Sequence, residues 1–130
     1  MKIAIFGTGY VGLVTGTCFS EMGNQVTCVD IDEAKLKKLA KGESPIYEPG
    51  LHELLERNIR EKRLSFTSDA RSAIENAGII FIAVGTPQDD AGNANLKFVM
   101  QVAETIGQYA NNEKLLSLKA PCRWAHLKKF

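Results

Sequence analysis

Short apolar segments alternate along the chain with longer segments in which apolar residues recur every three or four positions. A short apolar run bounded by turn residues is typical of a buried strand, whereas the longer spacing is typical of a helix that packs on one side. Glycine, asparagine or aspartate stands at most of the boundaries, where these residues favour turns and helix caps. The predicted strands cover residues 2–6, 25–30, 64–67, 78–84 and 114–118. The predicted helices cover residues 10–22, 32–41, 51–62, 69–76 and 96–109, with Asp32 and either Ser68 or Asp69 as N-terminal caps.

This alternation predicts βαβ units, and therefore a parallel sheet covered by helices. Residues 78–84 are apolar on both faces, which indicates a central strand. We expect an α/β fold of the Rossmann type, a doubly wound parallel sheet with about five strands, incomplete, over residues 1–118. An irregular tail is expected over residues 119–130. The helix over residues 10–22 holds small and apolar residues throughout, so we expect it to be buried.

Composition and charge exclude several classes of protein. The chain is 45% hydrophobic and 24% charged with a net charge of +1, which predicts an ordinary globular protein without affinity for nucleic acid or membranes. No apolar run is long enough to span a membrane, and the N-terminus lacks the layout of a signal peptide, so a cytoplasmic location is expected. Cys18, Cys28 and Cys122 have no metal-ligand spacing; the first two are expected to be buried and the third to lie in the tail.

The motif GTGYVG (residues 7–12) directly follows the first strand and opens the first helix, which is the context that a dinucleotide-binding turn requires. In such a turn Gly7 allows the sharp bend, Gly9 lets a pyrophosphate approach the backbone, and Gly12 lets the helix pack against the strand. The helix N-terminus then offers unpaired N–H groups and a positive dipole end to the phosphates. A glycine-rich turn that binds nothing is the alternative.

Polar residues after two further strands strengthen this hypothesis. Asp30 ends the second strand 23 residues after the first glycine of the motif, where a carboxylate accepts hydrogen bonds from the adenosine ribose and favours NAD over NADP. Asp32 is better placed than Asp30 to cap the next helix. Lys35 either reaches the ribose or phosphate edge or is a solvated helix lysine. Gly85 and Thr86 follow the fourth strand at the edge where such sheets bind ligands, or form a plain strand-ending turn.

Three segments, residues 6–32, 42–55 and 81–96, together resemble the UDP-glucose 6-dehydrogenases of the UDP-glucose/GDP-mannose dehydrogenase family. The resemblance implies oxidation of UDP-glucose to UDP-glucuronate in two NAD-dependent steps. It implies that Tyr10, Val11, Asp30, Lys35 and Thr86 contact NAD. The segment PIYEPGL (residues 45–51) carries the resemblance most specifically, and it places Tyr47 and Glu48 near the substrate cleft unless this loop only docks two helices.

The resemblance ends at about residue 116. The family continues roughly as VIKSTVPVGT, whereas this chain reads SLKAPCRWAHLKKF from Ser117 to Phe130. With suitable codons, one added base before codon 117 makes the same stretch read VIKSTVPVGTLKKV. We therefore expect a one-base deletion at or just before that codon, with a divergent C-terminus as the alternative. In this reading Pro121 replaces the family threonine that follows the fifth strand.

The resemblance also implies that the family's catalytic cysteine, its accompanying lysine, asparagine and aspartate, and the elements through which it oligomerises lie outside these 130 residues. We expect the chain alone to be catalytically inactive and its fifth strand to form an exposed edge. Three functions stay open: the NAD-binding part of a UDP-glucose dehydrogenase, the same part of a dehydrogenase for GDP-mannose or another nucleotide sugar, and a non-enzymatic NAD-binding module or inert fragment.

Overall fold

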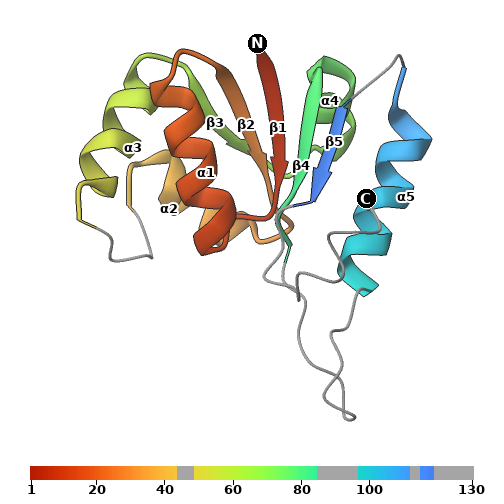
Figure 1. Ribbon diagram of the computed structural model, residues 1–130. Coiled ribbons are helices and arrows are strands. Elements are labelled where there is room, and N and C mark those ends of the chain that lie inside the picture. Colours follow the sequence, from red (N-terminus) through yellow and green to blue (C-terminus); the bar gives the residue numbers. More distant parts are fainter. Residues whose placement is uncertain (44–48, 85–96, 112–114, 119–130) are drawn as a thin grey trace.

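The computed structural model describes residues 1–43, 49–84, 97–111 and 115–118, the last four as backbone only. Five parallel strands form one sheet with the order β3-β2-β1-β4-β5 (Figure 1), so the first strand lies at its centre. The strands are β1 Lys2–Phe6, β2 Gln25–Val29, β3 Leu64–Thr67, β4 Ile79–Ile82 and β5 Leu115–Leu118. This order is that of the first five strands of a Rossmann sheet, which confirms the predicted fold class.

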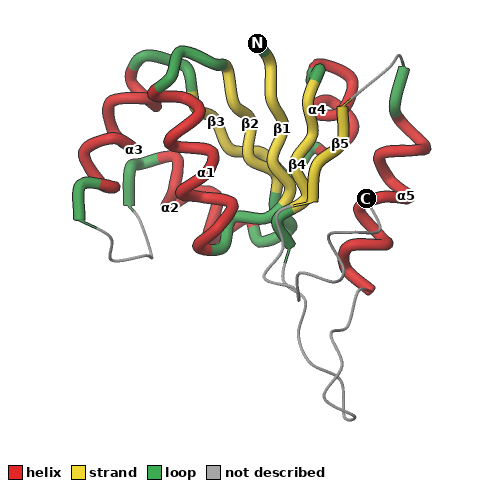
Figure 2. Tube along the Cα trace, in the orientation of Figure 1, coloured by secondary structure: helices red, strands yellow, loops and turns green. Residues whose placement is uncertain are grey.

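Helices cover both faces of the sheet, because successive residues of a strand point to opposite sides and both sides here are apolar. Ile3 and Ile5 of β1 face a cluster formed with α1, α2 and α3, whereas Ala4 and Phe6 face a cluster formed with α4 and α5. Figure 2 shows the helical layers on either side of the strands. The helices are α1 Tyr10–Glu21, α2 Glu33–Ala40, α3 Leu51–Arg60, α4 Ala70–Asn76 and α5 Lys97–Tyr109.

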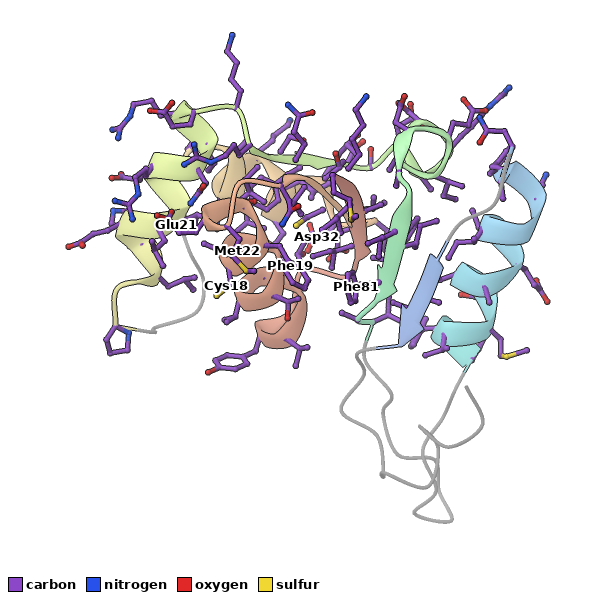
Figure 3. All side chains as sticks on the ribbon, turned by 45° about the horizontal axis from the view of Figure 1, so that its top comes forward. Cys18, Phe19, Glu21, Met22, Asp32 and Phe81 are labelled. Carbon is purple, nitrogen blue, oxygen red and sulfur yellow. The ribbon has the colours of Figure 1, made fainter. Side chains whose placement is uncertain are left out.

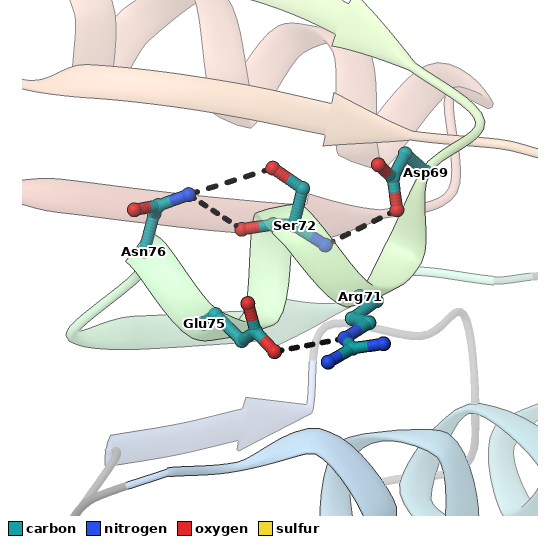
Figure 4. Close-up of polar contacts among 5 residues, drawn as sticks. All are labelled: Asp69, Arg71, Ser72, Glu75 and Asn76. Carbon is teal, nitrogen blue, oxygen red and sulfur yellow. Dashed lines mark hydrogen bonds and ion pairs between the residues drawn. The ribbon is translucent and has the colours of Figure 1, made fainter.

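Aspartates start two of these helices. An oxygen of Asp32 accepts a hydrogen bond from the Lys35 amide at 3.1 Å, and one of Asp69 accepts from the Ser72 amide at 3.2 Å (Figure 4). The cap of α2 is therefore as predicted, and of the two candidates for α4 the cap is Asp69. In the described part of the chain, no helix combines the length and the apolar character needed to cross a membrane.

Helix α1 contacts the sheet through one side only, which makes two predictions wrong. Its buried positions are Gly12, Leu13, Gly16, Thr17 and Ser20, which repeat every three or four residues. Cys18 lies on the other side and is exposed, whereas Cys28 on β2 is buried as predicted. The small residues of α1 suggested a helix buried on all sides, but they instead allow one side of the helix to lie close to the sheet. A β-carbon on Gly16, for example, would stand 2.9 Å from the Cys28 sulfur.

Large side chains fill the space beside this close contact. The ring of Phe19 on α1 lies 5.1 Å, centroid to centroid, from that of Phe81 on β4 (Figure 3). The close approach of α1 to the strands fixes the helix against the middle of the sheet. Its first turn is thereby held beside the carboxyl ends of β1 and β4.

Candidate functional site

A cavity of about 830 Å³ opens at the carboxyl ends of the strands, between the start of α1 and one side of α5. This is the edge at which open α/β sheets bind ligands. The structure brings six of the predicted site residues together around the cavity: Gly7, Gly9, Tyr10, Val11, Asp30 and Lys35. Gly12 lies beneath the cavity instead of lining it. Gly85, Thr86, Tyr47 and Glu48 lie outside the described residues.

The glycine turn packs against β4 and under α1 so tightly that side chains are excluded. Gly7 has a φ of +106°, and a β-carbon there would stand 2.6 Å from the carbonyl oxygen of Ala83. A β-carbon on Gly12 would stand 2.1 Å from the carbonyl oxygen of Gly7. These two glycines therefore shape the turn, as the motif predicts.

Gly9 differs from its two neighbours in the motif because nothing lies within 4 Å of its β-carbon position. It is the N-terminal cap residue of α1, and no side chain caps that helix. The first turn of α1 and the positive end of its helix dipole therefore lie at the cavity, whose lining includes Gly9, Tyr10 and Val11. An anionic group such as a diphosphate fits against this end of the helix.

Asp30 follows β2 directly and is held by four hydrogen bonds, two on each carboxylate oxygen. One oxygen accepts from the amide of Thr8 at 3.1 Å and from the Thr8 hydroxyl at 2.5 Å. The other accepts from the amides of Ile31 at 2.7 Å and Asp32 at 3.2 Å. Burial alone raises the pKa of Asp30, but these hydrogen bonds outweigh burial and hold that pKa below its usual value. Asp30 therefore presents a fixed negative charge to the cavity.

The cavity lining also contains apolar residues that sequence reasoning missed, one next to Asp30 and others on α5. Ile31, which is 93% exposed, stands beside Asp30, and α5 contributes Phe98, 45% exposed, together with Gln101 and Val102. A large apolar side chain that is exposed next to a cavity indicates a surface for a flat apolar group. Ile31, an apolar residue between two aspartates, could have been noticed in the sequence. The contribution of α5 could not, because nothing in its sequence indicates which face it turns to the cavity.

The described lining holds charges and apolar surface but contains no cysteine, histidine or glutamate side chain. Lys35 supplies a positive charge on the side of the cavity where Asp30 and Ser68 lie. Such a lining can hold a diphosphate, a ribose and a flat ring.

Comparisons with known proteins agree with this geometry. Residues 1–123 match the family model described as UDP-glucose/GDP-mannose dehydrogenase family, NAD binding domain. The chain is 54% identical over 119 residues to the UDP-glucose 6-dehydrogenase TuaD of Bacillus subtilis, covering 92% of this chain and 26% of that protein. It therefore spans about a quarter of the length of this relative.

Solved structures of the same kind superpose closely on the chain. A ternary complex of GDP-mannose dehydrogenase from Pseudomonas aeruginosa gives a TM-score of 0.88 at 36% identity, over 92% of this chain and 28% of that one. A UDP-glucose dehydrogenase from Pyrobaculum islandicum gives 0.87 at 34% identity, with the same two coverages. The chain thus shares its fold with solved nucleotide-sugar dehydrogenases.

Proposed function

The chain belongs to the UDP-glucose/GDP-mannose dehydrogenase family, and from that membership we propose that it is the NAD-binding part of an enzyme that oxidises UDP-glucose to UDP-glucuronate with two NAD. The observation that carries the proposal is the cavity in which the uncapped start of α1 and the carboxylate of Asp30 face the same space. One end suits a diphosphate and the other suits a ribose, which is the arrangement of a dinucleotide site.

In this proposal each wall of the cavity holds one part of NAD. The amides at the start of α1 bind the diphosphate beside Gly9, and Tyr10 and Val11 flank it. Asp30 binds the hydroxyls of the adenosine ribose, and its charge repels a 2′-phosphate. Ile31 and the apolar side chains of α5 enclose the adenine ring. When bound, NAD supplies the hydride acceptor for the oxidation.

Five further residues complete the proposed contacts. Lys35 lines the cavity on the Asp30 side, so we propose that its ammonium group contacts the ribose or a phosphate, with a solvated helix lysine as the alternative. Gly85 and Thr86 follow Ala83 and Val84, which line the cavity, and we propose that this turn contacts NAD as well. Tyr47 and Glu48 are proposed to lie near the sugar-nucleotide cleft on the strength of their motif alone.

Titration calorimetry of the 130-residue chain with NAD tests the proposal. We expect saturable heat in the micromolar to millimolar range and weaker binding of NADP. Absence of heat at millimolar NAD, from a chain whose circular dichroism shows it to be folded, contradicts the proposal.

We also propose that the 130 residues by themselves do not oxidise UDP-glucose, because the chain spans only about a quarter of its relative's length and the described cavity lining contains no cysteine, the nucleophile that the resemblance implies. The expected result is no increase in NADH absorbance when the chain is mixed with NAD and UDP-glucose. Turnover above the rate of the buffer blank contradicts this prediction.

GDP-mannose or another nucleotide sugar is the second candidate for the substrate, because one solved relative, at 36% identity, is a GDP-mannose dehydrogenase. The 54% identity to TuaD favours UDP-glucose. A non-enzymatic NAD-binding module is the third candidate. It predicts the same NAD binding as the other two, and it is contradicted if a longer protein that contains this chain oxidises a nucleotide sugar.

Gly9→Ala separates cofactor binding from folding. The backbone of Gly9 is extended, with a φ of −73°, and its β-carbon position is empty, so we expect the free energy of unfolding to change by less than about 0.5 kcal/mol. The added methyl group occupies space beside the start of α1 that the diphosphate needs, so the affinity for NAD should fall about tenfold or more, which corresponds to roughly 1.4 kcal/mol. Paired calorimetric and urea titrations measure both quantities, and unchanged NAD affinity would show that the diphosphate does not lie there.

A further inference from the structure

We infer that the hydroxyl of Thr8 is a positioning group for the cofactor, holding the carboxylate of Asp30 in the orientation that receives the adenosine ribose. This inference deepens the proposed function and rests on it. Thr8 is the unspecified second position of the glycine motif, to which the motif assigns no role. Its side chain is nonetheless fully buried and hydrogen-bonded to the one carboxylate of the cavity wall.

The hydrogen bonds around Asp30 show what the hydroxyl adds. Three of its four donors are backbone amides, of which two belong to the residues that follow Asp30 and are fixed by the entry into α2. They hold one carboxylate oxygen. Among the described residues, the donors to the other oxygen belong to Thr8: its amide at 3.1 Å and its hydroxyl at 2.5 Å. The hydroxyl therefore adds a second donor to this oxygen and a further restraint on rotation of the carboxylate about its bond to the β-carbon.

The backbone beneath this contact is rigid. The amide of Gly7 donates to the carbonyl of Val29 at 2.8 Å, and the amide of Asp30 donates to the carbonyl of Thr67 at 3.2 Å. Because both main chains are fixed, the side-chain hydrogen bond sets only the torsion of the carboxylate. A ribose diol needs two acceptor positions in a defined plane, so a fixed torsion reduces the entropy lost on binding.

The experiment combines a substitution with a change in the ligand. Thr8→Val removes the hydroxyl and keeps the shape and the backbone amide. NAD and its analogue that lacks the 2′-hydroxyl of the adenosine ribose are then titrated into both proteins. In the wild-type chain the missing hydroxyl should lower affinity about tenfold, as expected for a hydrogen bond to a charged group. In Thr8→Val the same change should cost about threefold or less, because one carboxylate oxygen has lost one of its two donors and is held less firmly.

A second readout does not need the cofactor. The titration of the Asp30 carboxyl, followed by carbon-13 NMR, should move to higher pH in Thr8→Val, because loss of a donor to the charged form raises the pKa. Thr8→Ser keeps the hydroxyl and should restore the wild-type midpoint. The titratable side chains that adjoin Asp30 in sequence or line the same cavity are common to all these variants; they are Tyr10, Cys28, Asp32, Glu33 and Lys35.

Thr17→Val is the matched control. Thr17 is also fully buried, on α1, but its hydroxyl donates to the carbonyl of Leu13 within the helix and does not reach the cavity. This variant should leave the Asp30 titration and the cost of the missing 2′-hydroxyl unchanged.

Each possible outcome decides the inference. It is overturned if loss of the 2′-hydroxyl lowers NAD affinity equally in wild type and Thr8→Val, or if the midpoint of the Asp30 titration does not move. It is also overturned if Thr8→Val binds NAD more tightly, which would mean that the Thr8 hydroxyl competes with the ribose for the carboxylate. If Thr8→Val does not fold, an ordinary midpoint for Asp30 in the wild-type chain overturns it. If the wild-type chain binds no NAD, the proposed function fails, and the Asp30 midpoint still shows whether Thr8 holds this carboxylate.

Discussion

Gly12→Ala is expected to lower the free energy of unfolding by about 3 kcal/mol, the upper end of the usual cost of overpacking, because the atoms that the new group meets cannot move aside. The new β-carbon would stand 2.1 Å from the carbonyl oxygen of Gly7 and 3.0 Å from its carbonyl carbon. Both atoms belong to the backbone of the glycine turn, so no side chain can move to make room. Either α1 moves off the sheet or the turn opens.

Both responses also damage the cavity, since the turn and the start of α1 line it. NAD binding should therefore become undetectable at concentrations that saturate the wild-type chain. The midpoint of thermal unfolding should fall by roughly 10 °C, given the usual relation between free energy and melting temperature for a domain of this size. Differential scanning calorimetry and calorimetric NAD titration measure the two effects.

Gly107→Ala provides the matched control for Gly12→Ala. Gly107 lies on α5, and nothing lies within 4 Å of its β-carbon position. The same change of residue should there stabilise the chain by about 0.5–1 kcal/mol, because alanine is the better helix former. If both substitutions had equal effects, the close approach of Gly12 to Gly7 would not determine stability.

Asn58→Leu is expected to cost about 2–3 kcal/mol of unfolding free energy, although it adds an apolar residue of similar size to the interior. Asn58 lies on α3 and is fully buried. Its amide nitrogen donates to a carboxylate oxygen of Glu21 and to the carbonyl of Leu54, both at 2.8 Å, and its oxygen accepts from Arg63 at 2.9 Å. The leucine leaves the Leu54 carbonyl and the Arg63 side chain without these bonds beside a fully buried position, whereas Glu21, whose side chain is 37% exposed, keeps its ion pair with Arg57.

The exposed Asn76 on α4 is the control for this substitution. Its amide nitrogen also donates to a carbonyl one turn earlier, that of Ser72, at 2.8 Å (Figure 4). Asn76→Leu removes this bond where water can replace it, so the change should stay within about 0.5 kcal/mol. Urea unfolding of the two variants measures the difference, and an equal midpoint for Asn58→Leu and wild type would contradict the assigned role.

The strands and helices were predictable to within a few residues because their signals are local. Apolar runs such as that of β4, and caps such as Asp32, are properties of neighbouring residues and do not depend on the rest of the fold. The side of α1 that faces the sheet was not predictable in this way. Its buried stripe consists of glycine, threonine and serine as well as leucine, so hydrophobicity gave no indication that Cys18 faces solvent.

The site was predictable as far as its motif defines it. Gly7, Gly9 and Asp30 lie where their spacing places them, since the carboxyl ends of adjacent parallel strands share one edge of the sheet. Thr8 and Phe98 were missed for different reasons. Thr8 stands at a position where the motif accepts any residue, and Phe98 reaches the cavity only through the packing of α5 on the sheet. The expected base deletion concerns mainly residues outside those described, and it stays a prediction.

The cavity draws its two walls from distant parts of the chain. The groups that face the proposed diphosphate and ribose come from one uninterrupted stretch, residues 7–35, whereas the facing wall comes from α5, which begins at Lys97. Mutation and recombination can therefore act on the two walls separately. A substitution in α5 alters the wall proposed for the adenine ring, while the groups proposed for the diphosphate and the ribose stay on residues 7–35.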